Sequence, residues 1–232
     1  MKENILVLSP LLRSPIIIND LIYHYNNSND ISFIIDIYGE FYGILEQHYP
    51  DVFKNTQVIE ISKIHSQKPL EILDNTKIVL FKSTIIEDFE DIYTLKTFDY
   101  IWNYLTKNNL YSRIYIVHLE PLIRSNIIPY FKNSSYYGIN ITAGISYMDH
   151  FEENEDTLEI LKYFDRFRVL HIVTSNDLSI LEKIFKINQP LLREITRKDY
   201  DYEFKTLENT NEVVDGTIIS YPYKYLPEGK NI

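Results

Sequence analysis

Short runs of Ile, Val, Leu and Phe alternate along this chain with segments whose apolar residues recur at helical spacing. Most of these runs are apolar on successive positions, which is typical of strands covered on both faces of a parallel sheet. The runs span residues 5–9, 31–36, 57–62, 77–83, 113–120 and 168–175. Because helical segments separate them, the pattern predicts repeated strand–helix units and an α/β, Rossmann-like fold, with a mainly parallel sheet and helices on both faces.

Capping residues and prolines indicate where the helices begin. Ser14 followed by Pro15 predicts a helix start, and Thr84 with Glu87 has the spacing of a capping box before the longest helix. The other predicted boundaries are a bend in the 85–107 helix at 94–97, a helix from 121 to 131, a loop over 133–137, a strand over 139–147, a helix ending at 185, and strands over 191–196 and 217–220. Without a repeat or a linker in the sequence, we expect one domain over residues 1–232.

Composition narrows the class of protein. The chain has 232 residues, of which 45% are hydrophobic, so it can bury a substantial core. It has no cysteine, which excludes disulfides, thiolate zinc sites and cysteine nucleophiles. An uninterrupted apolar run of about 18 residues, which a membrane span requires, is absent from the sequence. We therefore expect a cytoplasmic protein.

The charge balance bears on the choice of partner. There are 33 acidic and 23 basic residues, for a net charge of −10. This balance disfavours broad attraction to a nucleic-acid backbone, and the densest basic groups are small: Arg166 with Arg168, and Arg193 with Arg197 and Lys198. A nucleotide, a nucleotide-sugar, a partner subunit or a second copy of the chain fits the composition better.

In an open parallel sheet, ligands bind beyond the carboxyl ends of the strands, and this rule selects candidate site residues without any motif. The candidates are polar residues and one glycine: Ser9, Arg13 and Ser14 after the first strand, Asp36, Tyr38, Gly39 and Glu40 after the second, Ser83 and Thr84 after the fourth, His118 and Glu120 at the fifth, and Thr174, Ser175 and Asn176 after the sixth apolar run.

The first of these loops, residues 9–14, lies where a phosphate-binding turn would be. It contains no glycine, so the dinucleotide fingerprint and the Walker P-loop are both absent. We expect Arg13 and the amides of the following helix to bind any phosphate there; the alternative is a surface arginine beside an ordinary helix cap. Gly39 and Gly43 predict a tight turn after the second strand.

Three residues are candidates for catalysis. Asp36 ends a hydrophobic strand, a position from which a carboxylate can contact a ribose hydroxyl; the alternative is an aspartate that caps its own loop. His118 and Glu120 are two residues apart, so on a strand they would face the same side and could act as a base and its orienting carboxylate. The alternative is a structural histidine, which is also how we interpret His171.

No motif assigns a cofactor. Asp199 and Asp201 form an Asp-x-Asp pattern that could hold a divalent metal, although a solvated acidic loop explains them equally. Metalloprotease, serine-hydrolase and zinc motifs are absent from the sequence.

The order of the segments KIVLFKS (77–83), RIYIVHLEPL (113–122) and RVLHIVTSNDLSILEKIF (168–185) resembles the N-terminal half of GT-B glycosyltransferases, including phage DNA-glucosylating relatives. The resemblance covers about residues 1–190 as an arrangement of elements, and it would place Thr174, Ser175 and Asn176 in the ligand site. The chain departs from the family in two ways, because the first loop lacks glycines and 232 residues leave no room for the half that binds the nucleotide-sugar.

Two functions follow as expectations. The first is a glycosyltransferase-like enzyme that uses a nucleotide-sugar, with Arg13 near phosphate, Asp36 or His118 near sugar hydroxyls, and Glu120 supporting His118. The second is a non-catalytic Rossmann-like module, of phage or viral origin, that senses a nucleotide or assembles with a protein partner.

Overall fold

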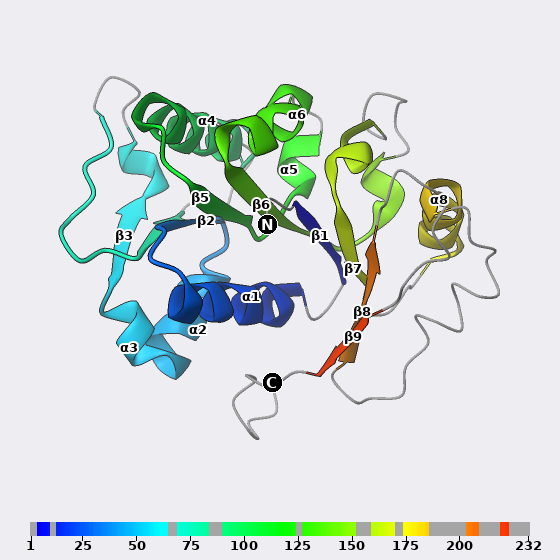
Figure 1. Ribbon diagram of the computed structural model, residues 1–232, viewed down its shortest axis with the longest axis horizontal. Helices are drawn as coiled ribbons and strands as arrows, with labels where there is room; N and C mark the ends of the chain where they lie inside the picture. The colour runs from blue at the N-terminus through cyan, green and yellow to red at the C-terminus, as the bar shows by residue number, and fades with distance from the viewer. Residues whose placement is uncertain are drawn as a thin grey trace.

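The computed structural model describes residues 4–9, 13–64, 69–83, 90–123, 127–151, 159–169, 174–185, 203–208 and 219–222. Its centre is a nine-stranded sheet in the order β3-β4-β2-β5-β6-β1-β7-β8-β9 (Figure 1). The first seven strands in this order are parallel, and β8 and β9 are antiparallel additions at one edge. The predicted α/β, Rossmann-like fold is confirmed.

The strands are β1 Ile5–Leu8, β2 Ser32–Asp36, β3 Thr56–Glu60, β4 Ile78–Lys82, β5 Ser112–Ile116, β6 Ile139–Ile145, β7 Arg166–Val169, β8 Glu203–Glu208 and β9 Ile219–Pro222. The first four match their apolar runs within two residues at either end, whereas β5 ends at 116 and not 120, and β7 shares only residues 168–169 with the run over 168–175. In β1, Ile5 and Val7 pack into one core while Leu6 and Leu8 pack into the other. Burial on both faces explains why the runs are apolar on successive residues.

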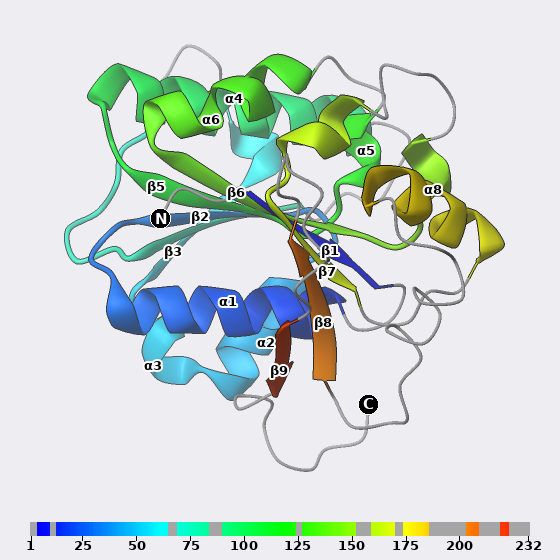
Figure 2. The ribbon, with the colours of Figure 1, turned by 45° about the vertical axis from the view of Figure 1, so that its right-hand side comes forward.

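Helices cover both faces of the sheet (Figure 2). One face carries α1 (Arg13–Asn27), α2 (Glu40–His48) and α3 (Pro50–Phe53). The other carries α4 (Glu90–Asn108), α5 (Glu120–Ile123) and α6 (Ile128–Tyr137), and α8 (Ser175–Phe185) contacts the short 3-10 helix η2 (Met148–Phe151). Three short 3-10 helices complete the described elements: η1 Ile61–Lys63, η2 Met148–Phe151 and η3 Ile160–Tyr163.

The distribution of helices follows from the direction of the connections. From β1 to β2 and from β2 to β3 the chain moves toward the β3 edge, while from β4 to β5 and from β5 to β6 it moves the other way. Right-handed crossovers in opposite directions must lie on opposite faces. As a result, β2 and β5 are neighbours in the sheet, but the helices that follow them, α2 and α5, lie on opposite faces.

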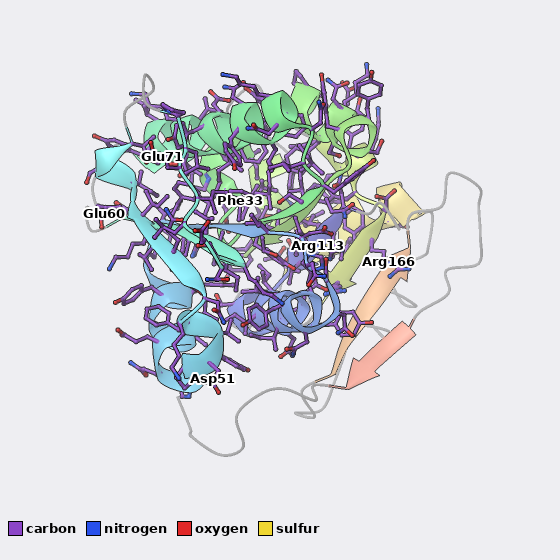
Figure 3. All side chains as sticks on the ribbon, turned by 60° about the vertical axis from the view of Figure 1, so that its left-hand side comes forward. Phe33, Asp51, Glu60, Glu71, Arg113 and Arg166 are labelled. Atoms are coloured by element: carbon purple, nitrogen blue, oxygen red, sulfur yellow. The ribbon has the colours of Figure 1, made fainter. Side chains whose placement is uncertain are left out.

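The free edge of β3 is covered by an extended segment of the chain. Gln57 Nε2 donates to the Glu71 carbonyl, and the Leu73 amide donates to Gln57 Oε1, both at 3.0 Å. Glu60 and Glu71 mark this side of the sheet in Figure 3. The Gln57 side chain thus holds the segment around residues 71–73 against β3. A covered edge strand is less able to pair with another chain.

Several predicted boundaries are wrong. The helix was expected to bend or split at 94–97, and it does not split, since α4 is continuous there and Thr97 Oγ1 donates to the Tyr93 carbonyl within the helix. The loop expected over 133–137 is the last part of α6, which ends at Gly138 with φ of 72°. The region 121–131, expected as one helix, contains all of α5 after Glu120 and the start of α6.

The late part of the chain also differs from the prediction. The strand β8 was not expected, because Glu203–Glu208 contains only two apolar residues, Phe204 and Leu207, in an otherwise polar segment. It pairs antiparallel with β7 and extends the sheet. The predicted strand near 217–220 corresponds to β9, while the one over 191–196 and the capping pair Thr84 and Glu87 lie outside the described residues.

Candidate functional site

The carboxyl ends of β2 and β5 form the candidate site. These strands are neighbours, and the helices that follow them, α2 and α5, lie on opposite faces of the sheet. Such a topological switch point is where open α/β sheets bind their ligands. Beside it lies the first turn of α1, whose leading backbone amides have no partner within the helix.

Three polar side chains from three elements meet here. Ser14, in the first turn of α1, donates from Oγ to Glu40 Oε2 at 2.5 Å. Glu40 is the first residue of α2, and its Oε1 lies 3.4 Å from His118 Nε2. Ser14 and His118 are each 6% exposed, whereas the Glu40 side chain is 41% exposed. One carboxylate therefore bridges two buried polar groups that the chain order separates by 104 residues, the distance from 14 to 118.

The sequence identified two of these three residues as candidates with a role. It placed Glu40 at the same sheet edge but gave it no function. The signal that could have found it is its position: Gly39 precedes it with φ of 74°, and a left-handed glycine before an acidic first helical residue aims that carboxylate back over the strand end.

Asp36, which ends β2, is fully buried. Its Oδ2 accepts the Tyr42 backbone amide at 3.0 Å, so it caps the start of α2. Burial raises the pKa of Asp36 to about 6, against the lowering effect of the Tyr42 amide and with a further increase from the Glu40 charge. The contact with the Tyr42 amide agrees with the loop-capping alternative, and the contact of Asp36 with a ribose stays a prediction.

Tyr38 gives the site an exposed aromatic surface. Its ring meets the His118 imidazole edge to face, with 4.3 Å between centroids and 81° between planes, and it is 39% exposed. Such a ring, apolar on its face and held by a neighbour, suits stacking against a planar group.

A cation lies on the adjoining strand. Lys82 ends β4 opposite Asp36 in the parallel register, and its Nζ sits 3.8 Å from the centroid of the Tyr42 ring. Arg13 is the first residue of α1, and its side chain lies outside the described residues.

The expected pairing of Glu120 with His118 rests on a wrong element boundary. The strand β5 ends at Ile116, so His118 lies in the following turn and Glu120 begins α5. Two-residue alternation does not apply beyond the strand end. Glu120 Oε1 accepts the Ser146 amide at 2.7 Å, which ties α5 to the end of β6. The carboxylate placed against His118 is that of Glu40.

The other candidates lie along the same edge but farther from this cluster in the topology. Ser9 follows β1 and its amide donates to the Ile145 carbonyl at 3.0 Å. Ser83 follows β4, and Ser175 begins α8. Thr174 precedes α8 and forms a reciprocal cap with Asp177, whose amide donates to Thr174 Oγ1 at 3.0 Å. Thr84, His171, Asp199 and Asp201 lie outside the described residues.

Chemically, the cluster offers donors and a carboxylate at a helix start. It is not a nucleophilic triad, because the serine hydroxyl donates to a carboxylate and the imidazole lies on the far side of that carboxylate. Among the described residues, no group of three or more His, Cys, Asp or Glu side chains is placed to hold a metal ion. No helix in the described part of the chain has both the length and the apolar character needed to cross a membrane.

Comparison with known proteins places the fold. No protein-family profile and no curated sequence matches the chain. Three solved structures of the genome packaging NTPase B204 from Sulfolobus turreted icosahedral virus 2 are similar to it. The complex with AMPPCP has a TM-score of 0.62 at 12% identity, covering 95% of this chain and 97% of that one. The sulfate complex gives 0.59 at 11%, covering 95% and 96%, and the AMP complex 0.56 at 14%, covering 95% and 98%.

At these identities the likeness concerns the fold alone. The sequence that follows β1 in this chain lacks the residues of a Walker P-loop. A Walker P-loop ends in Gly-Lys-Ser/Thr, with glycines that let backbone amides surround a phosphate. This chain has Leu12-Arg13-Ser14 and no glycine before Gly39. The resemblance to GT-B glycosyltransferases stays a prediction.

Proposed function

We propose that this chain is a nucleotide-binding module that takes the phosphates of its ligand at the first turn of α1, between the ends of β2 and β5, and does not turn the nucleotide over. The observation that carries the proposal is that two buried polar side chains, Ser14 and His118, both contact the Glu40 carboxylate at the switch point of a parallel sheet with helices on both faces. Burial of polar side chains costs free energy, so two of them at a sheet edge favour a role in ligand binding.

The electrostatics of this edge support an anionic ligand. The first-turn amides of α1 and the positive end of its dipole favour phosphate. Lys82 adds a positive charge at the end of β4, beside β2, and His118 adds an imidazole next to Glu40. Tyr38 is placed to contact a base or ribose beside the phosphates.

The fold comparison is consistent with this ligand class. The similar structures are those of a viral packaging NTPase bound to AMPPCP, AMP or sulfate, and the likeness extends over 95% of this chain. The absence of the glycines and of the P-loop lysine favours binding without hydrolysis, because both parts hold the β- and γ-phosphates during phosphoryl transfer.

Titration calorimetry with ATP, AMPPCP and AMP tests the proposal. We expect saturable binding and no release of inorganic phosphate from ATP. His118→Ala should weaken binding about tenfold or more, the equivalent of one hydrogen bond to a charged group. The matched control is His48→Ala, an exposed histidine at the end of α2, which should leave the affinity unchanged.

Other outcomes separate the alternatives. Tighter binding of UDP-, GDP- or ADP-sugars than of the corresponding nucleotides would favour the glycosyltransferase-like function. Failure to bind any of these ligands would overturn the proposal and leave a protein-interaction module. Steady phosphate release that is lost in Ser14→Ala would contradict the non-catalytic part alone.

A further inference from the structure

The carboxylate of Glu40 occupies the centre of the site in this structure. Oε2 accepts from the buried Ser14 hydroxyl at 2.5 Å, and Oε1 faces His118 Nε2 at 3.4 Å. Both oxygens therefore engage groups that the proposed function assigns to the ligand's phosphate. A carboxylate and a phosphate present the same kind of acceptor oxygens, so one can stand in for the other against the same donors.

The two donors are fixed, whereas Glu40 is placed to move. Ser14 and His118 are buried, with Ser14 in the 15-residue helix α1 and His118 held against Tyr38. The Glu40 side chain is 41% exposed and begins α2 directly after Gly39. A Cβ built on Gly39 would meet nothing within 4 Å, so open space surrounds this turn. Rotation of Glu40 toward solvent would uncover both donors without disturbing the core.

We propose that Glu40 is a built-in competitor for the phosphate site, whose carboxylate a phosphate group must displace from Ser14 and His118 before it can bind. This inference rests on the proposed function and adds the cost of displacing Glu40 to the binding of any phosphate group at this site.

The test compares Glu40→Gln and Glu40→Ala with the wild-type chain by calorimetry, using pyrophosphate and AMPPCP without divalent cations. Glutamine keeps the size and one acceptor oxygen but removes the charge, and alanine removes the competitor. We expect both variants to bind pyrophosphate and AMPPCP at least about tenfold more tightly, because a like charge a few ångströms from the anion is removed.

The matched control is Glu46→Gln, which removes the charge of an acidic side chain on the same helix. The Glu46 carboxylate accepts a hydrogen bond from the Tyr42 hydroxyl. The affinity of this variant should equal that of the wild-type chain. An increase as large as that of Glu40→Gln would mean that general charge, and not displacement, sets the affinity, and would overturn the inference.

Failure of this inference can be told from failure of the proposed function. If the wild-type chain binds AMPPCP and Glu40→Gln binds it equally or more weakly, Glu40 is not a competitor and the nucleotide-binding function stands. If Glu40→Gln binds AMPPCP more weakly than the wild-type chain only when Mg²⁺ is present, Glu40 holds the cation, which also overturns the inference. If no variant binds any of these ligands, both proposals fall.

Discussion

Asp20 Oδ1 and Arg168 Nη1 lie 2.9 Å apart in the interior, between α1 and β7. The second oxygen, Oδ2, accepts from Arg113 Nη1 at 3.0 Å, so one carboxylate serves guanidinium groups from two strands. Figure 3 shows Arg113 between the sheet and α1. Burial alone would raise the pKa of Asp20, but Arg168 and Arg113 outweigh it and hold this pKa below its ordinary value of 3.8.

Removal of this carboxylate should be costly. Asp20→Asn keeps the side-chain volume but leaves two buried guanidinium groups without their anion, and we expect a loss of about 3 to 5 kcal/mol in the free energy of unfolding, measured by urea denaturation. The control is Asp51→Asn in the exposed pair with Lys54, which should leave stability unchanged. A loss below about 1 kcal/mol in Asp20→Asn would show that the two arginines find other partners.

The Asp20 carboxylate also determines part of how the stability of the fold depends on acid pH. Since the folded-state pKa of Asp20 is lowered, its stabilising contribution is complete above about 3.8 and is lost as the pH falls below that value. The difference in stability between the wild-type chain and Asp20→Asn should therefore be constant from pH 5 to pH 8, a window of about three units above that titration. It should shrink only in strong acid; a difference that shrinks near neutral pH would contradict this.

Asp36 should behave in the opposite way. Its pKa is raised from 3.8 to about 6, so the folded protein binds this proton more tightly than the unfolded chain. The contribution of Asp36 to stability is then greatest below 3.8 and declines as the pH rises to about 6. Asp36→Asn still offers an oxygen to the Tyr42 amide, and we expect it to be more stable than the wild-type chain by about 1 to 3 kcal/mol at pH 7.5.

Thermal unfolding from pH 3.5 to 8 checks this, as the wild type and Asp36→Asn should converge in acid and separate above about pH 6. The contradicting result is a variant that is less stable than the wild-type chain at pH 7.5, which would mean that the ionised carboxylate stabilises the start of α2.

How far the sequence predicts the fold depends on which physical signal each element leaves. Strands buried on both faces, such as β1, must be apolar throughout, so their positions were predictable. The strand β8 at the antiparallel edge lacks this constraint and left no comparable pattern. The last turn of α6 was missed because Asn133 and Ser134 favour loops, yet in the structure Ser134 Oγ donates to the Phe131 carbonyl and stays helical.

The candidate site was predictable as an edge but not as a set of contacts. Ser14, Asp36 and His118 follow from the rule that ligands meet strand ends. Their grouping depends on β2 lying next to β5, which chain order does not give, since β3 and β4 come between them in the sequence. The strand alternation used to pair Glu120 with His118 does not apply, because the end of β5 was placed four residues too late, at 120 in place of 116.

Asn4 joins three elements just before β1, and its loss should destabilise the fold. Its Nδ2 donates to Ser134 Oγ and to the Tyr163 carbonyl, each at 2.9 Å, and its Oδ1 accepts the Ile141 amide at 2.9 Å. Asn4→Ala would leave buried polar groups without these partners. We expect a loss of about 2 to 4 kcal/mol in urea denaturation.

The control for Asn4 is Asn27→Ala, at the end of α1, where the amide donates to the Tyr23 carbonyl at an exposed position. That change should stay within about 0.5 kcal/mol of the wild-type chain. Equal effects at the two asparagines would contradict a special role for the buried one.

Two glycines on helices should respond to alanine with opposite signs. Gly138 ends α6 with φ of 72°, a conformation that an L side chain rarely adopts, and Gly138→Ala should cost about 1 to 2 kcal/mol. Gly43 lies inside α2 with nothing within 4 Å of a built Cβ. Gly43→Ala should therefore gain about 0.5 to 1 kcal/mol through the lower backbone entropy of the unfolded chain.

The cost at Gly138 has two potential sources, and a double variant separates them. A Cβ there would lie 2.3 Å from Cδ1 of Tyr111, whose ring is 68% exposed and can turn away. We therefore attribute the cost to the backbone, and the destabilisation caused by Gly138→Ala should be the same in a Tyr111→Ala background, as measured by urea denaturation. If the destabilisation disappears when Tyr111 is truncated, contact with the ring and not the left-handed backbone requires glycine at this helix end.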